Sequence, residues 1–326
     1  MSILITGGTG FLGAGLARKL LERGEDVVLF DVFPRIERIP DIKDKVKVIQ
    51  GDLKVWPEVL NAVKDNKVKG IFHLGAMLSL PSEDNPWASY QTNVAGTMYI
   101  LEAARLFGVK RIVFASSGAT YGLGIGDVIT DETIQRPINM YGIGKLFGEL
   151  LGRFYRRKFG LDFRCVRYCG VVIGPGYTTK AVPIYIPWMI EHAALGKPGA
   201  FECWVSEDAP MQIMYFKDIV EGTKMLYYAP EERIKTVCYN LSAGTQVPTA
   251  KDVERAIKKF VPEAKFTYKP DPVTMEIIYS LKASLIDSSR ASEEWGWDPQ
   301  YTDYEKIVED FINEARTKPK LYGLKE

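Results

Sequence analysis

The sequence predicts an α/β fold, with a doubly wound parallel sheet followed by a smaller C-terminal α/β domain. In the first half of the chain, short apolar runs alternate with segments of helical periodicity, which is typical of a parallel sheet covered by helices on both faces. In the second half, glycine and proline interrupt that alternation. The length of 326 residues suits two domains rather than one.

Each predicted strand of the first half is short and almost continuously apolar, as buried parallel strands are. These strands are expected at residues 3–6, 27–30, 46–49, 71–74 and 111–114, with a further one at 162–168. The helices follow from apolar residues spaced three and four positions apart. They are expected at residues 11–23, 56–65, 89–107 and 141–159, with shorter ones at 182–195, 218–228, 251–260 and 304–314.

Composition excludes several classes of protein. The 42 Lys and Arg residues against 41 Asp and Glu give a net charge of +1, which argues against a chain that binds nucleic acid through positive charge. No apolar run reaches the length of about 18 residues that a membrane span needs. The four cysteines and two histidines show no pair spaced for a metal ion, and His73 is expected in a core or capping role. We therefore expect a cytoplasmic protein with no metal, no nucleic-acid partner and no membrane partner.

A glycine-rich turn joins the first predicted strand to the first predicted helix. Gly7, Gly10 and Gly13 allow the backbone to approach a pyrophosphate closely, since side chains at these positions would block it. The helix that begins with Phe11 and Leu12 then offers free N–H groups and a partial positive charge to that anion. A strand, a glycine-rich turn and a helix in this order predict a Rossmann domain that binds a dinucleotide.

Acidic residues follow the next two strands. Asp31 closes the second strand, 21 residues after Gly10, where its carboxylate would accept hydrogen bonds from the ribose of adenosine. Because a carboxylate repels a 2′-phosphate, NAD is favoured over NADP, although Arg35 and Arg38 lie close enough to weaken that preference. Asp52 follows the third strand, where it is expected to meet the adenine ring; a simple loop aspartate is the alternative.

A serine, a tyrosine and a lysine form the predicted catalytic set. Tyr141 and Lys145 are four residues apart and therefore share one face of a helix. A tyrosine hydroxyl titrates at about 10, and a neighbouring ammonium group lowers that pKa. Ser117 follows the fifth predicted strand, at the edge of an α/β sheet where ligands bind. We expect Ser117 to orient a substrate oxygen while Tyr141 moves its proton.

Over essentially its whole length, the chain resembles the extended short-chain dehydrogenases/reductases. The residues that carry this resemblance are Gly7, Gly10, Gly13, Asp31, Asn93-Val94-Ala95-Gly96-Thr97, Ser117, Tyr141 and Lys145. The resemblance implies that Ser117, Tyr141 and Lys145 are catalytic and that Asn93 supports the central helix of the site. It also implies a homodimer formed through the predicted helices at 89–107 and 141–159.

The same resemblance implies that the two halves of the chain have different roles. Residues 1–168 would form the NAD-binding Rossmann domain, and residues 169–326 would mainly bind substrate, with some segments returning to the sheet. The implied cofactor contacts are Gly7, Gly10, Phe11, Leu12, Gly13, Asp31, Asp52, Leu53, Leu74, Gly75, Ala76, Asn93, Tyr141, Lys145 and Tyr168.

Three absences narrow the reaction within this group of enzymes. Its dehydratases carry an acidic pair directly after the catalytic hydroxyl residue, whereas Gly118 and Ala119 stand there in this chain. Its nucleotide-sugar epimerases bind a diphosphate through an Asn and an Arg, but this chain has Gly170 and Met211 at the matching positions. The stretch at residues 174–176 does match the epimerases. A nucleotide-sugar epimerase with tightly bound NAD is therefore the alternative function.

Other stretches are similar to the L-threonine 3-dehydrogenases of the same superfamily. They lie at residues 72–79, 135–137, 155–167, 201–203, 210–211, 239–243 and 295–297. This similarity implies that Ser79, Thr178 and Thr179 contact the substrate, together with Ser117 and Tyr141. We expect an NAD-dependent oxidoreductase that oxidises a secondary alcohol of a small-molecule substrate, L-threonine or a similar hydroxy acid.

The chain also departs from those dehydrogenases inside the expected substrate pocket. Ser117 replaces a threonine, Cys169 replaces a proline, and Lys180 replaces an acidic residue. A non-catalytic NAD-binding module is a further alternative. The intact set of Ser117, Tyr141 and Lys145 argues against that alternative, because a protein that only binds NAD does not need all three.

Overall fold

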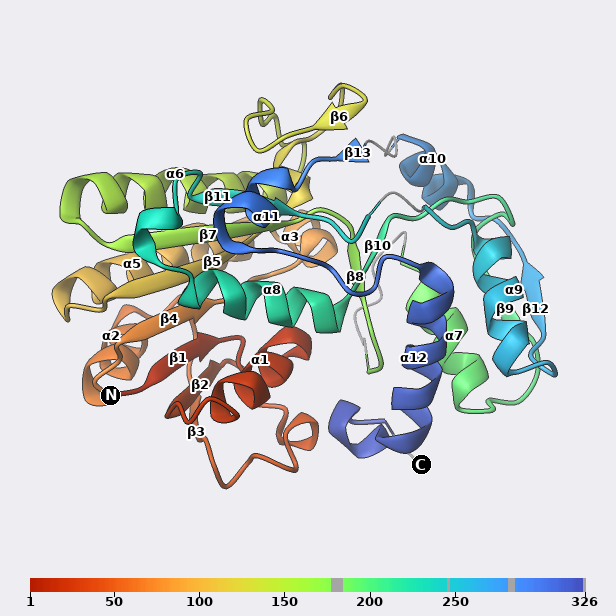
Figure 1. Cartoon of the computed structure of the whole chain (residues 1–326), viewed down its shortest axis with the longest axis horizontal. Coiled ribbons are helices and arrows are strands. Elements are labelled where there is room, and N and C mark those ends of the chain that lie inside the picture. The colour runs from red at the N-terminus through yellow and green to blue at the C-terminus, as the bar shows by residue number, and fades with distance from the viewer. Residues whose placement is uncertain (177–183, 245–246, 281–284, 325–326) are drawn as a thin grey trace.

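A seven-stranded parallel sheet forms the larger part of the computed structural model, which describes residues 1–176, 184–244, 247–280 and 285–324 (Figure 1). Its strands are β1 (Ile3–Thr6), β2 (Val27–Asp31), β3 (Lys47–Gln50), β4 (Gly70–His73), β5 (Arg111–Ser117), β7 (Asp162–Tyr168) and β11 (Cys238–Leu241). Their spatial order is β3-β2-β1-β4-β5-β7-β11, and every neighbouring pair is parallel. The order changes direction between β1 and β4, which creates a crevice at their carboxyl ends.

Helices cover both faces of this sheet (Figure 1). One face carries α1 (Phe11–Leu21) and α8 (Phe216–Tyr228), and the other carries α2 (Trp56–Asp65), α5 (Gly96–Leu106) and α6 (Met140–Phe159). Successive residues of β1 point to opposite faces, because Ile3 and Ile5 pack in the first core and Leu4 packs in the second. Both faces are therefore apolar, and the predicted doubly wound parallel sheet is confirmed.

A third core gathers residues from the second half of the chain (right side of Figure 1). Its helices are α7 (Ile186–Ala194), α9 (Ala250–Phe260) and α12 (Tyr304–Thr317). The small parallel strand pairs are β8 (Val171–Ile173) with β10 (Ile213–Tyr215), β9 (Phe201–Cys203) with β12 (Phe266–Tyr268), and β6 (Val128–Ile129) with β13 (Leu285–Ile286). The predicted smaller C-terminal α/β domain is thus present.

Several elements differ from the sequence prediction. The helix expected at 89–107 is divided into α4 (Pro86–Ser89), a π-helical turn η2 (Tyr90–Ala95) and α5. The sequence did not predict β11, α3 (Ser79–Asp84), α10 (Pro272–Ser280) or α11 (Ser289–Trp295). Short 3₁₀ turns occur at η1 (Ile36–Arg38), η3 (Gly118–Thr120), η4 (Glu231–Arg233) and η5 (Pro319–Tyr322). Among the described residues, no helix combines the length and the apolar character that crossing a membrane requires.

Helix α6 lies unusually close to the sheet. A Cβ atom at Gly148 would be 2.5 Å from the ring of Phe114 on β5, and one at Gly152 would be 2.1 Å from the ring of Phe163 on β7. Glycine at both positions therefore lets the helix backbone rest directly on aromatic side chains. This close packing brings Lys145, at the start of the same helix, down to the carboxyl end of β5.

Candidate active site

The glycine-rich turn has the geometry of an anion-binding site. Gly7 has a φ of +65°, a conformation that glycine adopts readily, and the N–H of Gly10 donates to the Gly7 carbonyl at 3.0 Å. A Cβ at Gly13 would lie 2.2 Å from that same carbonyl oxygen. Helix α1 then begins at Phe11, behind an N-cap glycine that has no side chain to occupy the first N–H groups. Turn and helix start together form a cradle that side chains would fill, which fits a pyrophosphate.

Asp31 is tied to this turn from the end of β2. Its Oδ2 accepts hydrogen bonds from the backbone N–H of Thr9, at 3.1 Å, and from the Thr9 hydroxyl, at 2.7 Å. The backbone N–H of Arg35 donates to the same hydroxyl at 3.0 Å. Arg38 is buried, its guanidinium donates to the Gly176 carbonyl at 2.7 Å, and burial lowers its pKa. The two arginines therefore differ, because Arg38 holds a backbone segment and Arg35 is exposed.

The turns after β3 and β4 lie beside the glycine-rich turn. A Cβ at Gly7 would be 3.0 Å from Cα of Gly75, so these two backbones almost touch. Leu53 is buried against Gly75, while Leu74 and Ala76 are half-buried. The carboxylate of Asp52 accepts from the N–H of Lys54 at 2.9 Å and pairs with its ammonium at 3.2 Å.

The three residues of the predicted catalytic set come from β5 and the first turns of α6. Ser117 ends β5, and its Oγ accepts from the N–H of Ala119 at 3.2 Å. Lys145 is buried, its Nζ donates to the Ala115 carbonyl at 2.6 Å, and the same atom lies 5.6 Å from the ring centre of Tyr141. Burial lowers the pKa of Lys145 to about 8. The structure thus brings the lysine ammonium to both the tyrosine ring and the strand that carries the serine.

Asn93 lies in the π-helical turn η2, where its side-chain amide bonds mainly to Met77 and, at 3.3 Å, also donates to the hydroxyl of Ser89. Its Oδ1 accepts from the N–H of Met77, and its Nδ2 donates to the Met77 carbonyl, both at 2.8 Å. A Cβ at Gly144 of α6 would lie 3.0 Å from the Asn93 side chain. Asn93 therefore connects the loop after β4 to helix α6. π-helical turns of this kind occur frequently at functional sites.

His73 is a neutral residue of the core. The Thr6 hydroxyl accepts from the N–H of Gly75 at 3.0 Å, so its own proton points to Nδ1 of His73, at 2.7 Å. The Thr97 hydroxyl donates to the Asn93 carbonyl at 2.7 Å and therefore accepts from Nε2 of His73, at 3.1 Å. The ring is thus protonated on Nε2 alone, and burial lowers the pKa of His73 to about 3. This agrees with the core role that the sequence favoured.

The remaining predicted site residues are less closely associated with this group. The Tyr168 hydroxyl is hydrogen bonded to Thr223 of α8 at 2.8 Å, so it points into the helix layer. Ser79 is half-buried at the start of α3. Thr178, Thr179 and Lys180 lie outside the described residues.

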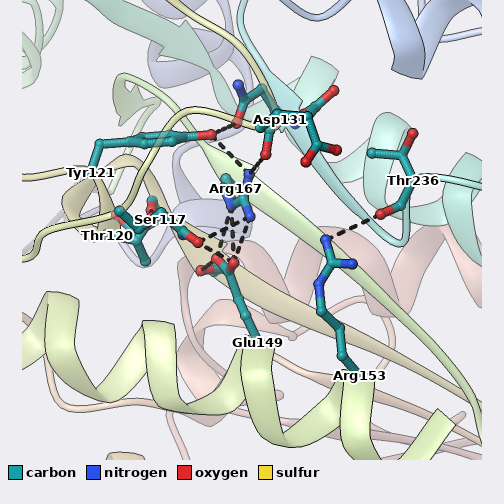
Figure 2. Close-up of polar contacts among 12 residues, drawn as sticks. Ser117, Thr120, Tyr121, Asp131, Glu149, Arg153, Arg167 and Thr236 are labelled. Atoms are coloured by element: carbon teal, nitrogen blue, oxygen red, sulfur yellow. Dashed lines mark hydrogen bonds and ion pairs between the residues drawn. The ribbon is translucent and has the colours of Figure 1, made fainter. Parts of the chain in front are cut away.

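Sequence reasoning missed a buried ion pair near Ser117 of the predicted catalytic set (Figure 2). Glu149 of α6 and Arg167 of β7 pair at 2.7 Å, with side chains only 1% and 2% exposed. One signal was available, since Arg167 interrupts an otherwise apolar part of a predicted strand. Glu149 also has a carboxylate oxygen within 4.8 Å of the sulfurs of Cys165 and Cys238. Because both of its oxygens accept from Arg167, we assign this cluster to the ion pair and not to a metal.

A glycine-rich turn, an acidic residue after β2 and a Tyr-x-x-x-Lys helix on a doubly wound sheet define a class of dinucleotide-dependent enzymes. The chain belongs to the NAD dependent epimerase/dehydratase family, whose family model matches residues 3–242. It is an enzyme of this family with similarity to L-threonine 3-dehydrogenases.

Three relatives illustrate that similarity. The mitochondrial L-threonine 3-dehydrogenase of Bos taurus is 33% identical over 318 residues, which cover 95% of this chain and 82% of that protein. The structure of L-threonine 3-dehydrogenase from Trypanosoma brucei is 28% identical with a TM-score of 0.85, covering 99% of this chain and 98% of that one. The GalE-like L-threonine dehydrogenase from Cupriavidus necator, in its holo form, is 27% identical with a TM-score of 0.83, covering 96% and 99%.

Proposed function

We propose that this enzyme is an NAD-dependent dehydrogenase that oxidises the secondary alcohol of a small polar substrate, L-threonine or a similar hydroxy acid. The observation that carries the proposal is the position of the buried Lys145 ammonium, 5.6 Å from the ring centre of Tyr141 and bonded to the strand that ends in Ser117. The similarity to L-threonine 3-dehydrogenases over nearly the whole chain supports the substrate class.

In this mechanism each residue of the set has one task. Tyr141 accepts the proton of the substrate hydroxyl, and Ser117 donates a hydrogen bond that orients the same oxygen. Lys145 is a cation below its pKa of about 8, and its charge favours the tyrosinate. Bound NAD supplies the hydride acceptor. Asn93 keeps the loop after β4 against α6, so that Tyr141 and Lys145 stay in place.

Residues 1–168 are proposed to hold the cofactor, and residues 169–326 are proposed mainly to bind substrate. The glycine-rich turn and the start of α1 would hold the pyrophosphate, and Asp31 would hold the adenosine ribose. The preference for NAD over NADP is supported by the Asp31 carboxylate and by Arg38, whose guanidinium is bonded to the Gly176 carbonyl. Ser79, Thr178 and Thr179 remain proposed substrate contacts.

The epimerase alternative has less support from the described residues. Met211, which stands where those epimerases carry an arginine, is buried in the apolar core of the second half of the chain.

The test is NADH formation with the purified protein, NAD and a panel of hydroxy amino acids, hydroxy acids and aldoses. Absorbance that rises with L-threonine supports the proposal, and a rise with another alcohol keeps the mechanism but replaces the substrate. No rise with any compound, together with NAD that copurifies with the protein, would favour the epimerase instead.

A homodimer is proposed on the evidence of an apolar stripe along α6. Ile143, Phe147, Leu150 and Phe154 are spaced four, three and four residues apart and are 47%, 37%, 60% and 42% exposed. An apolar stripe on a solvent-exposed helix face is typical of a helix that packs against a partner. Leu150→Glu should convert a dimer into a monomer in analytical ultracentrifugation. A wild-type mass of 36.7 kDa under the same conditions would contradict the proposal.

We propose that the protein is located in a reducing compartment of the cell, such as the cytoplasm. The four cysteines are buried free thiols, which suits a reducing environment. Localisation of the tagged full chain by microscopy tests this, and a signal confined to an oxidising compartment would overturn it.

A further inference from the structure

The buried ion pair between Glu149 and Arg167 is held in a forked geometry (Figure 2). Nε of Arg167 donates to both carboxylate oxygens of Glu149, at 3.0 and 3.1 Å, and Nη2 donates to Oε2 at 2.7 Å. Burying two charges costs hydration free energy, and their mutual attraction recovers only part of that cost. Apolar residues at these positions would therefore stabilise the fold equally well. A role beyond stability therefore has to be sought in what the pair contacts.

Those contacts link Glu149 to the strand end that carries Ser117. The hydroxyl of Ser116, directly before it, donates to Oε1 of Glu149 at 2.5 Å. On the other side, Nη1 of Arg167 donates to the hydroxyl of Tyr121 at 2.8 Å, and Tyr121 follows the η3 turn that begins after Ser117. The pair thus bonds to residues on both sides of Ser117, to Ser116 through Glu149 and to Tyr121 through Arg167.

Glu149 also lies one helical turn after Lys145, on the same face of α6. Burial lowers the pKa of Lys145, and Cys165 and Glu149 act against that shift. The other titratable groups that face Lys145 are His73 of β4, Cys165 of β7 and Tyr141 of its own helix. His73 and Cys165 are uncharged at neutral pH, since burial lowers the pKa of the first and raises the pKa of the second.

Arg167 determines what that carboxylate does to the lysine. A lone buried carboxylate one turn away would draw the Lys145 ammonium into an ion pair and away from Tyr141. Because the guanidinium fork occupies both oxygens of Glu149, Lys145 bonds instead to the Ala115 carbonyl and stays near the tyrosine ring.

We propose that Glu149 and Arg167 are positioning residues for the reaction. Their ion pair fixes the strand end that carries Ser117 to the helical turn that carries Lys145. Because the two charges cancel, the pair adds almost no net charge next to Tyr141 and Lys145. This inference rests on the proposed catalytic roles of Tyr141 and Lys145.

Two charge-removing variants test it through the pH dependence of the site. Glu149→Gln removes a negative charge near Lys145 and Tyr141, so the pKa values of both side chains fall. The rising limb of the kcat–pH profile, which follows the ionisation of Tyr141, and the falling limb, which follows loss of the Lys145 cation, therefore both move to lower pH. Arg167→Gln removes a positive charge, so both limbs move to higher pH. In each variant kcat falls by about 10- to 100-fold through misplacement, while the Kd for NAD stays unchanged.

A second readout needs no substrate. Tyrosinate absorbance of the NAD-bound protein, measured against the same protein carrying Tyr141→Phe, follows the ionisation of Tyr141 alone. Its midpoint should move in the same directions as the kinetic limbs. If the wild-type protein oxidised no compound in the panel, the proposed function would fail, and this titration would still decide the inference.

The matched control is Asp162→Asn at the opposite end of β7. Asp162 and Arg164 form a buried pair on that strand, at 2.8 Å, and Asp162 also pairs with Arg111 and Arg156. This control should lose stability without moving either limb. The double variant Glu149→Gln/Arg167→Gln leaves no unpaired charge, so it should fold and show a wild-type pH profile with a lower kcat. Limbs that stay at the wild-type pH in both single variants, or full kcat in the folded double variant, would overturn the proposal.

Discussion

The close packing of α6 on the sheet makes Gly148 a sensitive position. A Cβ added there would lie 2.5 Å from Cζ of Phe114, whereas ordinary contacts begin at 3.4 Å. Helix and ring would have to separate by roughly 1 Å, since neither is at a flexible surface. The ring of Phe114 also lies 5.0 Å from Nζ of Lys145. Movement of either one therefore displaces the ammonium from its position beside Tyr141.

Two effects on the free energy of unfolding oppose each other in Gly148→Ala. Alanine favours a helix over glycine by about 1 kcal/mol, and overpacking of a buried site costs about 1–3 kcal/mol. The net loss of stability should be about 2 kcal/mol at most. The rate suffers more, because a misplacement near 1 Å costs on the order of 100-fold in kcat.

Urea denaturation and NADH formation measure these two quantities on the same preparation. Gly126→Ala is the matched control, because a Cβ there meets nothing within 4 Å. It should keep both the stability and the kcat of the wild type. Full activity in Gly148→Ala, with a stability equal to that of the control, would refute the reasoning.

Four further outcomes are expected. Tyr141→Phe removes the group that we propose accepts the proton, so turnover should fall about 10²–10⁴-fold with an unchanged Kd for NAD; retained turnover would contradict the mechanism. Since burial lowers the pKa of Lys145 to about 8, the cation is lost above that pH and kcat for oxidation should decline there; a kcat that keeps rising would contradict this. Asp31→Ala should weaken NAD binding more than NADP binding in fluorescence titrations, and equal losses would argue against its ribose contact. Asp162→Asn leaves the Arg164 guanidinium buried and unpaired, which should cost about 3–5 kcal/mol in urea denaturation; an unchanged midpoint would show that the pair does not matter.

Local patterns predicted the part of the site that is local in sequence. The glycine-rich turn lies within residues 7–13, and Tyr141 and Lys145 are one helical turn apart, so spacing alone placed them on a turn and a helix face. The strands were predicted because burial on both faces leaves a continuous apolar run. The four residues of β11 do not form a continuous apolar run, so the sequence does not mark them as a strand. Their place in the sheet depends on pairing with β7, where Cys238 lies opposite Cys165.

Partners distant in the chain were beyond this reasoning. Asn93 holds Met77, and the tautomer of His73 depends on two threonine hydroxyls from β1 and α5. The π-helical turn at η2 has the same apolar spacing as a regular helix, so periodicity cannot separate them. Arg167 was visible as a charge in the apolar C-terminal half of its strand, but its carboxylate partner is on another element.

The late position of β11 and α8 in the chain has a consequence for synthesis on the ribosome. Residues of α8 and β11 complete the core on one face of the sheet, although that sheet begins at residue 3. At about 5–20 residues per second, the nascent sheet waits several seconds with that face covered by α1 alone. During this interval a chaperone that shields apolar surface would have its longest opportunity to bind, and a chain released at residue 168 would keep that surface exposed.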